Sequence, residues 1–405
     1  MRAPPLLLTG TILSLALAAT PVFSQSAGQP FETRAPNAKG QTPAFPNQTR
    51  APQPTSKLQI KTEVVADGLP HLWAMEFLPD GRMLATAKDG EIVLVSPNGG
   101  GTQEVEGVPT VESGGQGGLL DVAIAPDFTQ SRLIYFSFSE PRDDGNGTSV
   151  ASAKLIEDGD GAALEGTKVI FRQTPSYSNS KHFGSRLVFG PDNMLYVTVG
   201  ERSDRKTRVH AQDLSRGFGK VFRINAEGKA PADNPFVGRD DAQPEIWSYG
   251  HRNMQSATID SRGRLWTVEH GPKGGDELNR PEAGRNYGWP VITYGIDYSG
   301  RPIGDGITAA EGMEQPVYYW DPVIGPSGMA FYEGDAIPEW KDAILIGGLV
   351  AQGLVVLHME GDQVKFEERV PLDARIRDVK VGPDGAVYAV TEDGDSSTIL
   401  RLTKS

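Results

Sequence analysis

The sequence predicts an all-β protein, specifically a six-bladed β-propeller of four-stranded antiparallel blades. The first observation is a recurring signal in which an apolar residue precedes Pro-Asp-Gly or a variant, and alternating apolar residues follow. Proline sets φ at the first turn position and Gly or Asn accepts the positive φ that follows, so each copy is expected to be a β-hairpin. The second observation is that no stretch combines sustained helical periodicity with helix caps.

The spacing of these turns sets the number of repeating units. Copies of the signal begin at Phe77, Ile124, Phe189, Ile259 and Val381. The long gap before the last copy leaves room for one more unit, at Phe331–Val356. Six units over residues 57–405 give roughly 58 residues each, which suits a four-stranded blade with its loops. A β-helix would repeat at a much shorter period, and a pair of β-sandwiches would not recur at this one.

The N-terminus has the features of an export signal. A positive Arg2 precedes an apolar run over Leu6–Ala19, and Val22-Phe23-Ser24 offers a cleavage site. We therefore expect residues 1–24 to be a signal peptide and the mature protein to be periplasmic or secreted. The run is too short to span a bilayer and no other stretch approaches that length, so no transmembrane anchor is expected after signal removal.

Residues 25–56 differ in composition from the rest of the chain. They are rich in Pro, Gln, Thr, Ala and Gly and lack hydrophobic periodicity. Such a segment is typical of a flexible or polyproline-like linker. We therefore expect a linker at 25–56 and the propeller domain at 57–405.

Composition also excludes several classes of protein. The chain has no cysteine, which excludes disulfides, thiol ligands and thiol catalysis. Its formal net charge is -13 and it has no basic cluster, so nucleic acid is not an expected partner. No long heptad repeat is present, which leaves monomer and dimer both open.

His182 is the first candidate for catalysis. It lies in a polar loop just before a strand, where a loop histidine at the mouth of a propeller channel makes a good general base. Glu201 ends the next strand, and its carboxylate would orient the imidazole from the neighbouring strand. The alternative is that His182 is an ordinary polar loop residue.

Three arginines are candidates for binding an anion. Arg252 lies in the motif GHRN, and its fork of donors suits a polycarboxylate or a quinone oxygen. It would serve equally as a structural arginine paired across a blade. Arg375 and Arg377 alternate along a predicted strand, so both are expected on one side, with either an anion between them or neutralisation by Asp373 and Asp378.

The segment Glu269–Asn279 is a candidate calcium site. Its glycines, proline and adjacent carboxylates predict a tight turn rich in oxygen atoms. Calcium takes six to eight oxygen ligands, many of them backbone carbonyls. The spacing is not that of an EF-hand, and a solvated acidic turn is the alternative.

Together these segments resemble the soluble PQQ-dependent aldose sugar dehydrogenase family over nearly the whole predicted domain. The matching stretches are GGQGGLLDVAIAPDF, HFGSRLVFGPDNMLYVTVGERSDR, AQDL, GHRN, EHGPKGGDELN, NYGWPVITYGIDYSG, GMAFY and RIRDV. The resemblance implies a six-bladed propeller that uses PQQ and calcium to oxidise aldose sugars at C1 to lactones. It also implies an electron acceptor as a partner, which the sequence does not identify.

The resemblance assigns roles to individual positions. It implies that His182 is the base, that Glu201 takes the place of a supporting aspartate, and that Arg252 stabilises charge on the substrate oxygen. The implied contacts to PQQ are Gln116, Arg252, Asn253, Tyr298, Arg375 and Arg377. The implied calcium ligands are the carbonyls of Gly271 and Pro272 at the quinone, and Glu277 and Tyr287, helped by Asp276, at a second site.

One departure from the family pattern keeps other functions open. The family often has a lysine that contacts PQQ where this chain has Val350. Losing one charge-assisted bond costs about 1.5–3 kcal/mol of cofactor binding. Val350 and Glu201 therefore leave open a non-catalytic propeller that binds glycans or proteins. A calcium-dependent lactonase would need several acidic or Asn ligands at the axis, whereas the acids here cluster in one loop.

Overall fold

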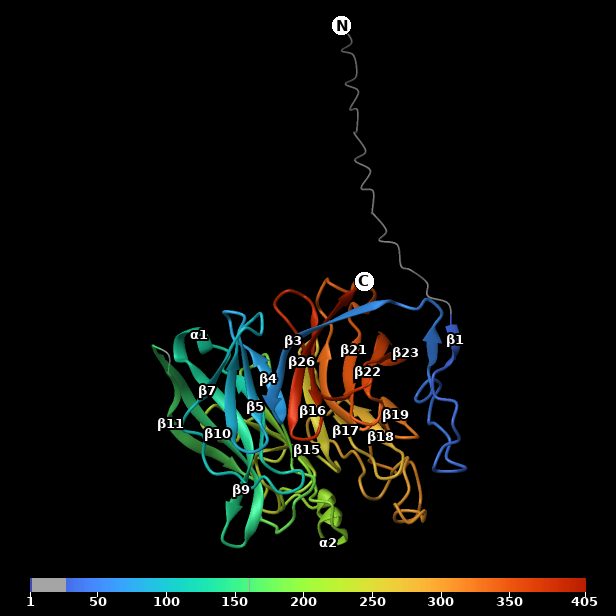
Figure 1. Cartoon of the computed structure of the whole chain (residues 1–405). Coiled ribbons are helices and arrows are strands. Elements are labelled where there is room, and N and C mark those ends of the chain that lie inside the picture. Colours follow the sequence, from blue (N-terminus) through green and yellow to red (C-terminus); the bar gives the residue numbers. More distant parts are fainter. Residues whose placement is uncertain (2–26, 160) are drawn as a thin grey trace.

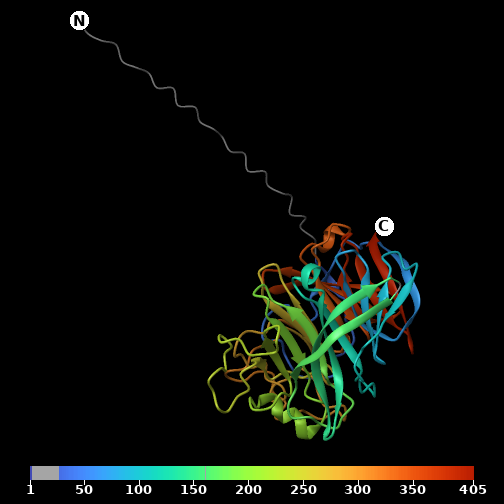
Figure 2. The same cartoon turned by 90° about the vertical axis from the view of Figure 1, so that its left-hand side faces the viewer.

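The computed structural model describes Met1, residues 27–159 and residues 161–405, and it confirms the propeller (Figure 1). Six four-stranded antiparallel sheets follow one another around a central axis. A second view, turned by 90°, shows the sheets packed side by side around that axis (Figure 2). The predicted signal peptide, residues 1–24, lies outside the described residues apart from Met1.

Each blade is a meander of four neighbouring strands, numbered here along the chain. Blade 1 contains β4 (Leu72–Phe77), β5 (Met83–Ala87), β6 (Glu91–Val95) and β7 (Thr102–Val105). Blade 2 contains β8 (Leu119–Ile124), β9 (Leu133–Arg142), β10 (Gly145–Asp158) and β11 (Gly161–Arg172). Blade 3 contains β12 (Gly184–Phe189), β13 (Leu195–Val199), β14 (Lys220–Ile224) and β15 (Ile246–Tyr249).

The second half of the ring repeats this arrangement. Blade 4 contains β16 (Met254–Ile259), β17 (Leu265–Glu269), β18 (Asp276–Asn279) and β19 (Tyr318–Trp320). Blade 5 contains β20 (Pro326–Phe331), β21 (Ile344–Gly348), β22 (Gly353–Glu360) and β23 (Gln363–Pro371). Blade 6 contains β24 (Arg375–Val381), β25 (Val387–Glu392), β26 (Ser396–Lys404) and the early strand β3 (Ile60–Pro70).

Blade 6 closes the ring by joining the two ends of the propeller domain. β3 runs antiparallel to β26, from Ile60 opposite Lys404 to Pro70 opposite Ser396. The first strand of each blade contacts the first strand of the next, and β24 contacts β4. The ring therefore has no gap between its last blade and its first.

The turn signals join the first two strands of their blades, as expected. In blades 1, 3, 4 and 6 a backbone hydrogen bond closes the turn, for example from Gly81 N to Leu78 O at 2.9 Å and from Gly385 N to Gly382 O at 2.9 Å. The residue that donates this bond, the fourth of the turn, has positive φ, +86° at Gly81 and +60° at Asn193. The hairpin prediction is therefore confirmed at the level of individual turns.

Helices are few and short. They are α1 (Phe128–Ser131), α2 (Arg205–Arg208), and the 3-10 turns η1 (Val209–Gln212) and η2 (Pro338–Trp340). None of the helices in the described part of the chain is long and apolar enough to cross a membrane.

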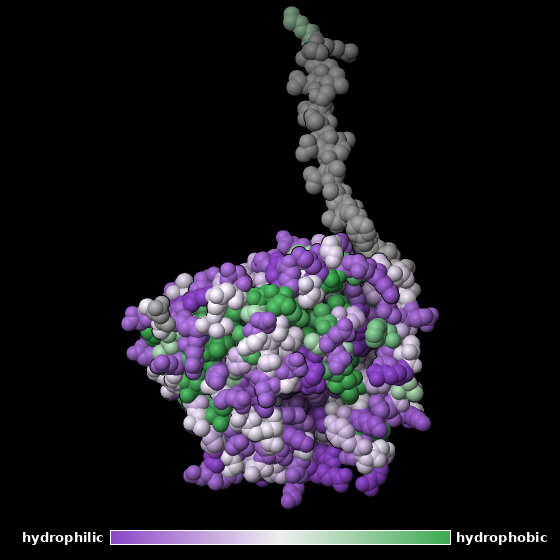
Figure 3. Space-filling view, viewed as in Figure 1, coloured by the Kyte–Doolittle hydropathy of each residue, from purple (hydrophilic) through white to green (hydrophobic). Residues whose placement is uncertain are grey.

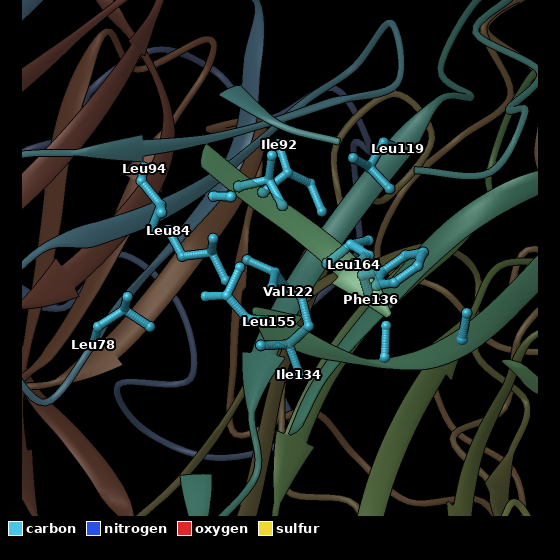
Figure 4. Close-up of a cluster of buried hydrophobic side chains, with 14 of the residues drawn as sticks. Leu78, Leu84, Ile92, Leu94, Leu119, Val122, Ile134, Phe136, Leu155 and Leu164 are labelled. Carbon is cyan, nitrogen blue, oxygen red and sulfur yellow. The ribbon is translucent and has the colours of Figure 1, made fainter. Parts of the chain in front are cut away.

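The core lies between neighbouring blades. In Figure 4, Leu84 and Ile92 of blade 1 meet Val122, Phe136 and Leu155 of blade 2, and all five side chains are at most 1% exposed. Strands covered on both faces lose the apolar–polar alternation, which is why every residue of β5 is buried. Outside, the face shown in Figure 3 is mainly hydrophilic, with hydrophobic residues in separate patches.

A buried ion-pair group braces the centre of the ring. Arg186 on β12 pairs with Asp121 on β8 at 2.8 Å and with Asp378 on β24 at 3.1 Å. Asp378 also accepts a hydrogen bond from Met75 N on β4 at 3.0 Å. Burial raises the pKa of Asp121 to about 6, although Arg186 opposes this. One cluster of charges thus connects four innermost strands.

The segment expected to be a flexible linker instead packs against the propeller. β1 (Ala27–Pro30) pairs with β2 (Pro52–Pro54), and this arm runs down the outside of blades 4 and 5 (Figure 1). Its backbone at Asn37 and Ala38 donates to the carboxylate of Asp321, both at 2.9 Å. Arg50 donates to the Asp321 carbonyl at 2.6 Å. The arm is ordered by hydrogen bonds to a distant part of the chain, which composition cannot reveal.

Candidate active site

One face of the ring collects the predicted site residues. In a meander, the start of the first strand and the end of the second lie at the same edge of the blade. Gln116 and His182 precede first strands, Glu201 and Gly271 follow second strands, and Arg375 begins β24. The topology therefore brings residues from blades far apart in sequence to one rim, where α2 also lies (Figure 1).

A cavity of about 410 Å³, here called the axial cavity, opens on this face. All six blades or their loops contribute to its wall. The predicted residues that line it are Gln116, Asn253, Gly271, Pro272, Asp276, Tyr298, Arg375 and Arg377. Most of the predicted cofactor contacts therefore do converge on one space.

A smaller cavity of about 180 Å³, here called the side cavity, adjoins the axial cavity. The two share Pro272 and Tyr298 in their walls. Glu201 and Arg252, predicted to be catalytic, line the side cavity. The residues predicted to contact the cofactor and those predicted to be catalytic therefore line two adjoining cavities that share part of their walls.

His182 is held in place by three contacts. Its Nδ1 lies 2.8 Å from Glu201 Oε1, and its backbone N donates to Gln116 Oε1 at 2.8 Å. Its carbonyl accepts from Arg202 N at 3.3 Å. Its side chain is 7% exposed, and a positive φ of +51° turns the backbone at this position. Because a carboxylate accepts at Nδ1, the proton lies there and Nε2 keeps its lone pair.

Burial sets the charge state of this pair. Burial, together with the positive charges of Arg252, Lys181 and Arg202, lowers the pKa of His182 well below its ordinary value. Burial raises the pKa of Glu201 to about 7, although Arg252 and the Ser203 backbone N–H favour the carboxylate. The imidazole is therefore neutral at neutral pH, which is the form that can accept a proton.

Arg252 is buried against the turn predicted to bind calcium. It donates to His270 O at 2.9 Å and to Gly271 O at 2.7 Å, and its guanidinium lies 5.2 Å from the Trp289 ring centroid. Its Nε is buried and has no hydrogen-bond partner among the described residues. An unsatisfied buried donor is costly, so this atom points to a partner that binds from outside the chain.

Arg375 and Arg377 face the axial cavity together, as the alternation predicted, but a different acid neutralises them. Arg375 lies 3.0 Å from Glu392 Oε1, and Arg377 donates to Glu392 Oε2 at 2.6 Å. Glu392 lies opposite Arg375 on the neighbouring strand β25. Asp378, one of the acids expected in this role, is instead the buried partner of Arg186.

The structure separates Asp276 from Glu277. Asp276 lines the axial cavity, and its carboxylate accepts from three backbone N–H groups, those of Gly271 at 2.8 Å and of Ile324 and Gly325 at 2.9 Å. Successive side chains of a strand point to opposite faces. Asp276 therefore does not join Glu277 in a second metal site, contrary to expectation; it holds the Gly271 turn in place.

Glu277 and Tyr287 do lie together, around a very small inner cavity of about 10 Å³. Glu269 lines the same cavity, and burial followed by the Glu269 charge raises the pKa of Glu277. The Oδ1 of Asn279 is buried and unpartnered among the described residues. No group of three or more His, Asp or Glu residues in the described part of the chain is arranged to hold a metal ion.

Several residues of the axial cavity were not predicted. They are His71, Trp73, Lys88, Gln255, His270 and Glu392. Lys88 directly follows β5, just as His270 directly follows β17. Aligning the blades with one another would have marked Lys88 as a rim position, whereas no motif marks Glu392, whose role depends on pairing across strands.

The fold and cavity define a class: six-bladed propellers with a polar, arginine-rich ligand site at the axis. A family model, described as Glucose / Sorbosone dehydrogenase, matches residues 69–401. Aldose sugar dehydrogenase YliI of Escherichia coli (strain K12) is 43% identical over 350 residues, covering 85% of this chain and 93% of that relative. The chain therefore belongs to the glucose/sorbosone dehydrogenase family, and within it to the oxidoreductases of the aldose sugar dehydrogenase type.

Two solved structures support the same placement. The soluble aldose sugar dehydrogenase from Escherichia coli in the apo-form has a TM-score of 0.81 and 42% identity, covering 86% of this chain and 100% of that one. The PQQ-bound form of aldose sugar dehydrogenase from Streptomyces coelicolor has a TM-score of 0.72 and 28% identity, covering 86% of this chain and 99% of that one.

Proposed function

We propose that this protein oxidises aldose sugars at C1 to lactones with PQQ and calcium. The observation that carries the proposal is the buried His182–Glu201 pair at 2.8 Å, set beside a cavity walled by guanidinium and amide groups. The PQQ-bound relative from Streptomyces coelicolor supports the choice of cofactor. A neutral, oriented imidazole next to an anion-binding cavity suits proton removal from a sugar hydroxyl.

The residues of the axial cavity fit PQQ, a flat quinone with three carboxylates. Two arginines and Lys88 offer positive charge, and Gln116 and Asn253 offer amide groups. Arg252, whose Nε is unpartnered, lies in the wall of the adjoining side cavity. Val350 lines the cavity where the family often has a lysine, and Lys88 offers a cation from blade 1. These residues would hold the cofactor through charge-assisted hydrogen bonds.

The calcium positions are argued from oxygen donors. The carbonyls of Gly271 and Pro272 would serve at the axial cavity, and Glu277, with the Tyr287 loop and the unpartnered Oδ1 of Asn279, would serve inside blade 4. Carboxylate, amide and backbone carbonyl oxygens are the donors that calcium prefers. When bound, PQQ supplies the two-electron oxidant and calcium supplies a Lewis acid that polarises it.

The chain's own residues then handle the proton. Oxidation of C1 removes the hydroxyl proton and the hydrogen on C1 as a hydride. Glu201 keeps the Nδ1–H tautomer of His182, so Nε2 accepts the hydroxyl proton. Arg252 stabilises the negative charge that develops on the substrate oxygen.

Reconstitution tests this proposal. Apo-protein with PQQ and calcium is expected to reduce an artificial dye when glucose or other aldoses are added, and omission of either component is expected to abolish turnover. His182→Ala is expected to lower kcat by about 10²–10⁴-fold. A wide sugar panel that gives no turnover, with no effect of His182→Ala, would overturn the proposal. Lactone hydrolysis that needs calcium but not PQQ would indicate the lactonase instead.

Export and reoxidation complete the proposal. The apolar N-terminal run favours cleavage near residue 24 and a periplasmic or secreted product, and an electron acceptor must collect the electrons there. N-terminal sequencing of the protein from a periplasmic fraction tests the first point. Retention of the first 24 residues in the mature protein would contradict it.

A further inference from the structure

The wall of the side cavity contains positive charge that the proposed reaction does not use. α2 contributes Arg205 and Arg208 to a wall that also contains Glu201 and Arg252. These arginines lie in a run of basic residues, Arg205-Lys206-Thr207-Arg208. The side cavity thus joins the catalytic pair to a cationic rim.

Arg208 is the part of this rim that has no partner. It is half-buried, and its guanidinium forms no hydrogen bond or ion pair within the described ranges 27–159 and 161–405. Arg205 differs, because it is 71% exposed and lies 3.7 Å from Asp297. Glu201 and Asp297 interact with the charge of Arg208, but neither forms an ion pair with it. A half-buried guanidinium without a bound acid favours an anion that arrives with a ligand.

The acids of the same cavity are already engaged. Asp204 accepts from Lys206 N at 2.9 Å and from the Tyr177 hydroxyl at 2.8 Å. Asp297 accepts from the backbone and hydroxyl of Ser299 at 3.0 and 2.8 Å. Glu201 is bound to His182 and also accepts from Ser203 N at 3.0 Å. The cavity is therefore balanced in formal charge, but Arg208 is not paired within it.

We infer that Arg208 is a specificity-determining residue that binds a carboxylate on the substrate, so that the preferred aldoses are hexuronic acids. The inference rests on the proposed function. Glu201 and Arg208 line the same cavity, so a sugar whose C1 lies at the His182–Glu201 pair has its other end within the reach of that cavity. The carboxylate is a spectator, and C1 still loses one proton and one hydride.

The number of cations favours a carboxylate over a phosphate. One guanidinium presents a planar fork that matches the two oxygens of a carboxylate. Arg252 directs its donors to the carbonyls of His270 and Gly271, and Arg205 lies at the exposed edge beside Asp297. A doubly charged phosphate would call for a second cation, but Arg252, the other guanidinium of this wall without an ion pair, is already assigned to the substrate oxygen at C1.

The test compares charged and neutral sugars in the reconstituted enzyme. In the wild type, kcat/KM is expected to be higher for D-glucuronate and D-galacturonate than for D-glucose and D-galactose. Arg208→Gln is expected to lower the ratio of uronate to neutral kcat/KM by about 10- to 100-fold, the range for one charge-assisted bond. Arg208→Lys, which keeps the charge but loses the fork, is expected to fall in between.

Arg239→Gln is the matched control for surface charge. Arg239 pairs with Asp241 at 2.7 Å and lines neither cavity, so the uronate preference is expected to survive its loss. A second readout needs no turnover: calorimetry with methyl glucopyranosiduronate, which is blocked at C1. Methyl glucopyranosiduronate is expected to bind the wild type more tightly than methyl glucopyranoside does. Arg208→Gln is expected to remove this difference in affinity.

Failure of this inference can be told apart from failure of the proposed function. Oxidation of neutral aldoses with the same uronate ratio in the wild type and Arg208→Gln would overturn only the role of Arg208. Wild-type preference for glucose 6-phosphate over glucuronate would overturn the carboxylate assignment. Absence of turnover with every aldose would overturn the proposed function, and calorimetry would then still decide whether Arg208 binds a carboxylate.

Discussion

The charge state of each ionisable side chain at the site, and its availability to a ligand, depend on the partner that the side chain has. His182 is neutral because it is buried near positive groups, and Glu201 fixes its proton at Nδ1. Arg375 and Arg377 are paired with a single acid, Glu392, whereas Arg208 has none among the described residues. These pairings, more than the residue types alone, determine which groups are available to a ligand.

The His182–Glu201 pair predicts a pH dependence. Burial raises the pKa of Glu201 to about 7, so below that pH the acid is protonated and stops holding the Nδ1–H tautomer. We expect kcat/KM to fall as pH drops through about 7. We expect Glu201→Gln to lower kcat by about 10²–10⁴-fold and to abolish that acid limb. A pH–rate profile from steady-state turnover measures both, and an unchanged acid limb in the variant would contradict the assignment.

Glu392 is expected to stabilise the apo-protein and, by pairing with the arginines, to weaken the binding of the cofactor. Burial alone would raise its pKa, but His71, whose Nε2 lies 3.9 Å from Oε2, and the ion pairs with Arg377 and Arg375 hold its pKa well below the ordinary value. Glu392→Gln leaves Arg377 uncompensated in a buried site until an anion binds. We expect a lower Tm for the apo-protein and PQQ binding tighter by about 3- to 30-fold.

Calorimetry and thermal melts with and without PQQ measure these two effects. The lowered pKa of Glu392 also predicts that stability depends on pH. A carboxylate with a lowered pKa contributes stability that is lost as pH falls below its unfolded pKa near 4.5. The wild type is therefore expected to lose more stability than Glu392→Gln in that range. Weaker PQQ binding in the variant would show that Glu392 positions the arginines rather than competing with the cofactor.

At the scale of elements, the expectations from the sequence match the structure where residues close together in the chain determine it. They differ from the structure where contacts between distant residues determine it. The Pro-Asp turns and the alternation of Arg375 and Arg377 are local patterns, and both were predicted correctly. The packing of residues 27–56 depends on Asp321, far along the chain, and was missed. The opposite faces of Asp276 and Glu277 follow from strand geometry, which the expectation of a turn at Glu269–Asn279 obscured.

The N-terminal arm predicts a measurable contribution to stability. Arg50 donates to the carbonyls of Glu32 at 2.7 Å, Arg34 at 2.8 Å and Asp321 at 2.6 Å. Arg50→Ala is expected to lower the free energy of unfolding by about 1.5–3 kcal/mol, the range for bonds from a charged donor. Exposed Lys57 gives the control, since Lys57→Ala is expected to change it by less than about 0.5 kcal/mol. Equal effects in denaturant unfolding would mean that the arm is not anchored by Arg50.

At the scale of the whole molecule, the central ion-pair group is expected to set the rigidity of the ring. Arg186 lies between Asp121 and Asp378, and all three side chains are at most 3% exposed. Arg186→Leu would leave the two buried acids close together with only Lys380 nearby, a cation that already pairs with Glu76 at 2.7 Å. We expect it to lower the free energy of unfolding by about 3–5 kcal/mol. Chemical denaturation checks this, and a loss below about 1 kcal/mol would show that the blades are held by their apolar contacts alone.

The pairing of β3 with β26 has a consequence for biogenesis. β3 is synthesised long before β26, so the nascent chain carries an unpaired strand edge until β26 emerges. Closure of the ring therefore waits for β26, and a chain truncated within that strand keeps a permanent site for aggregation.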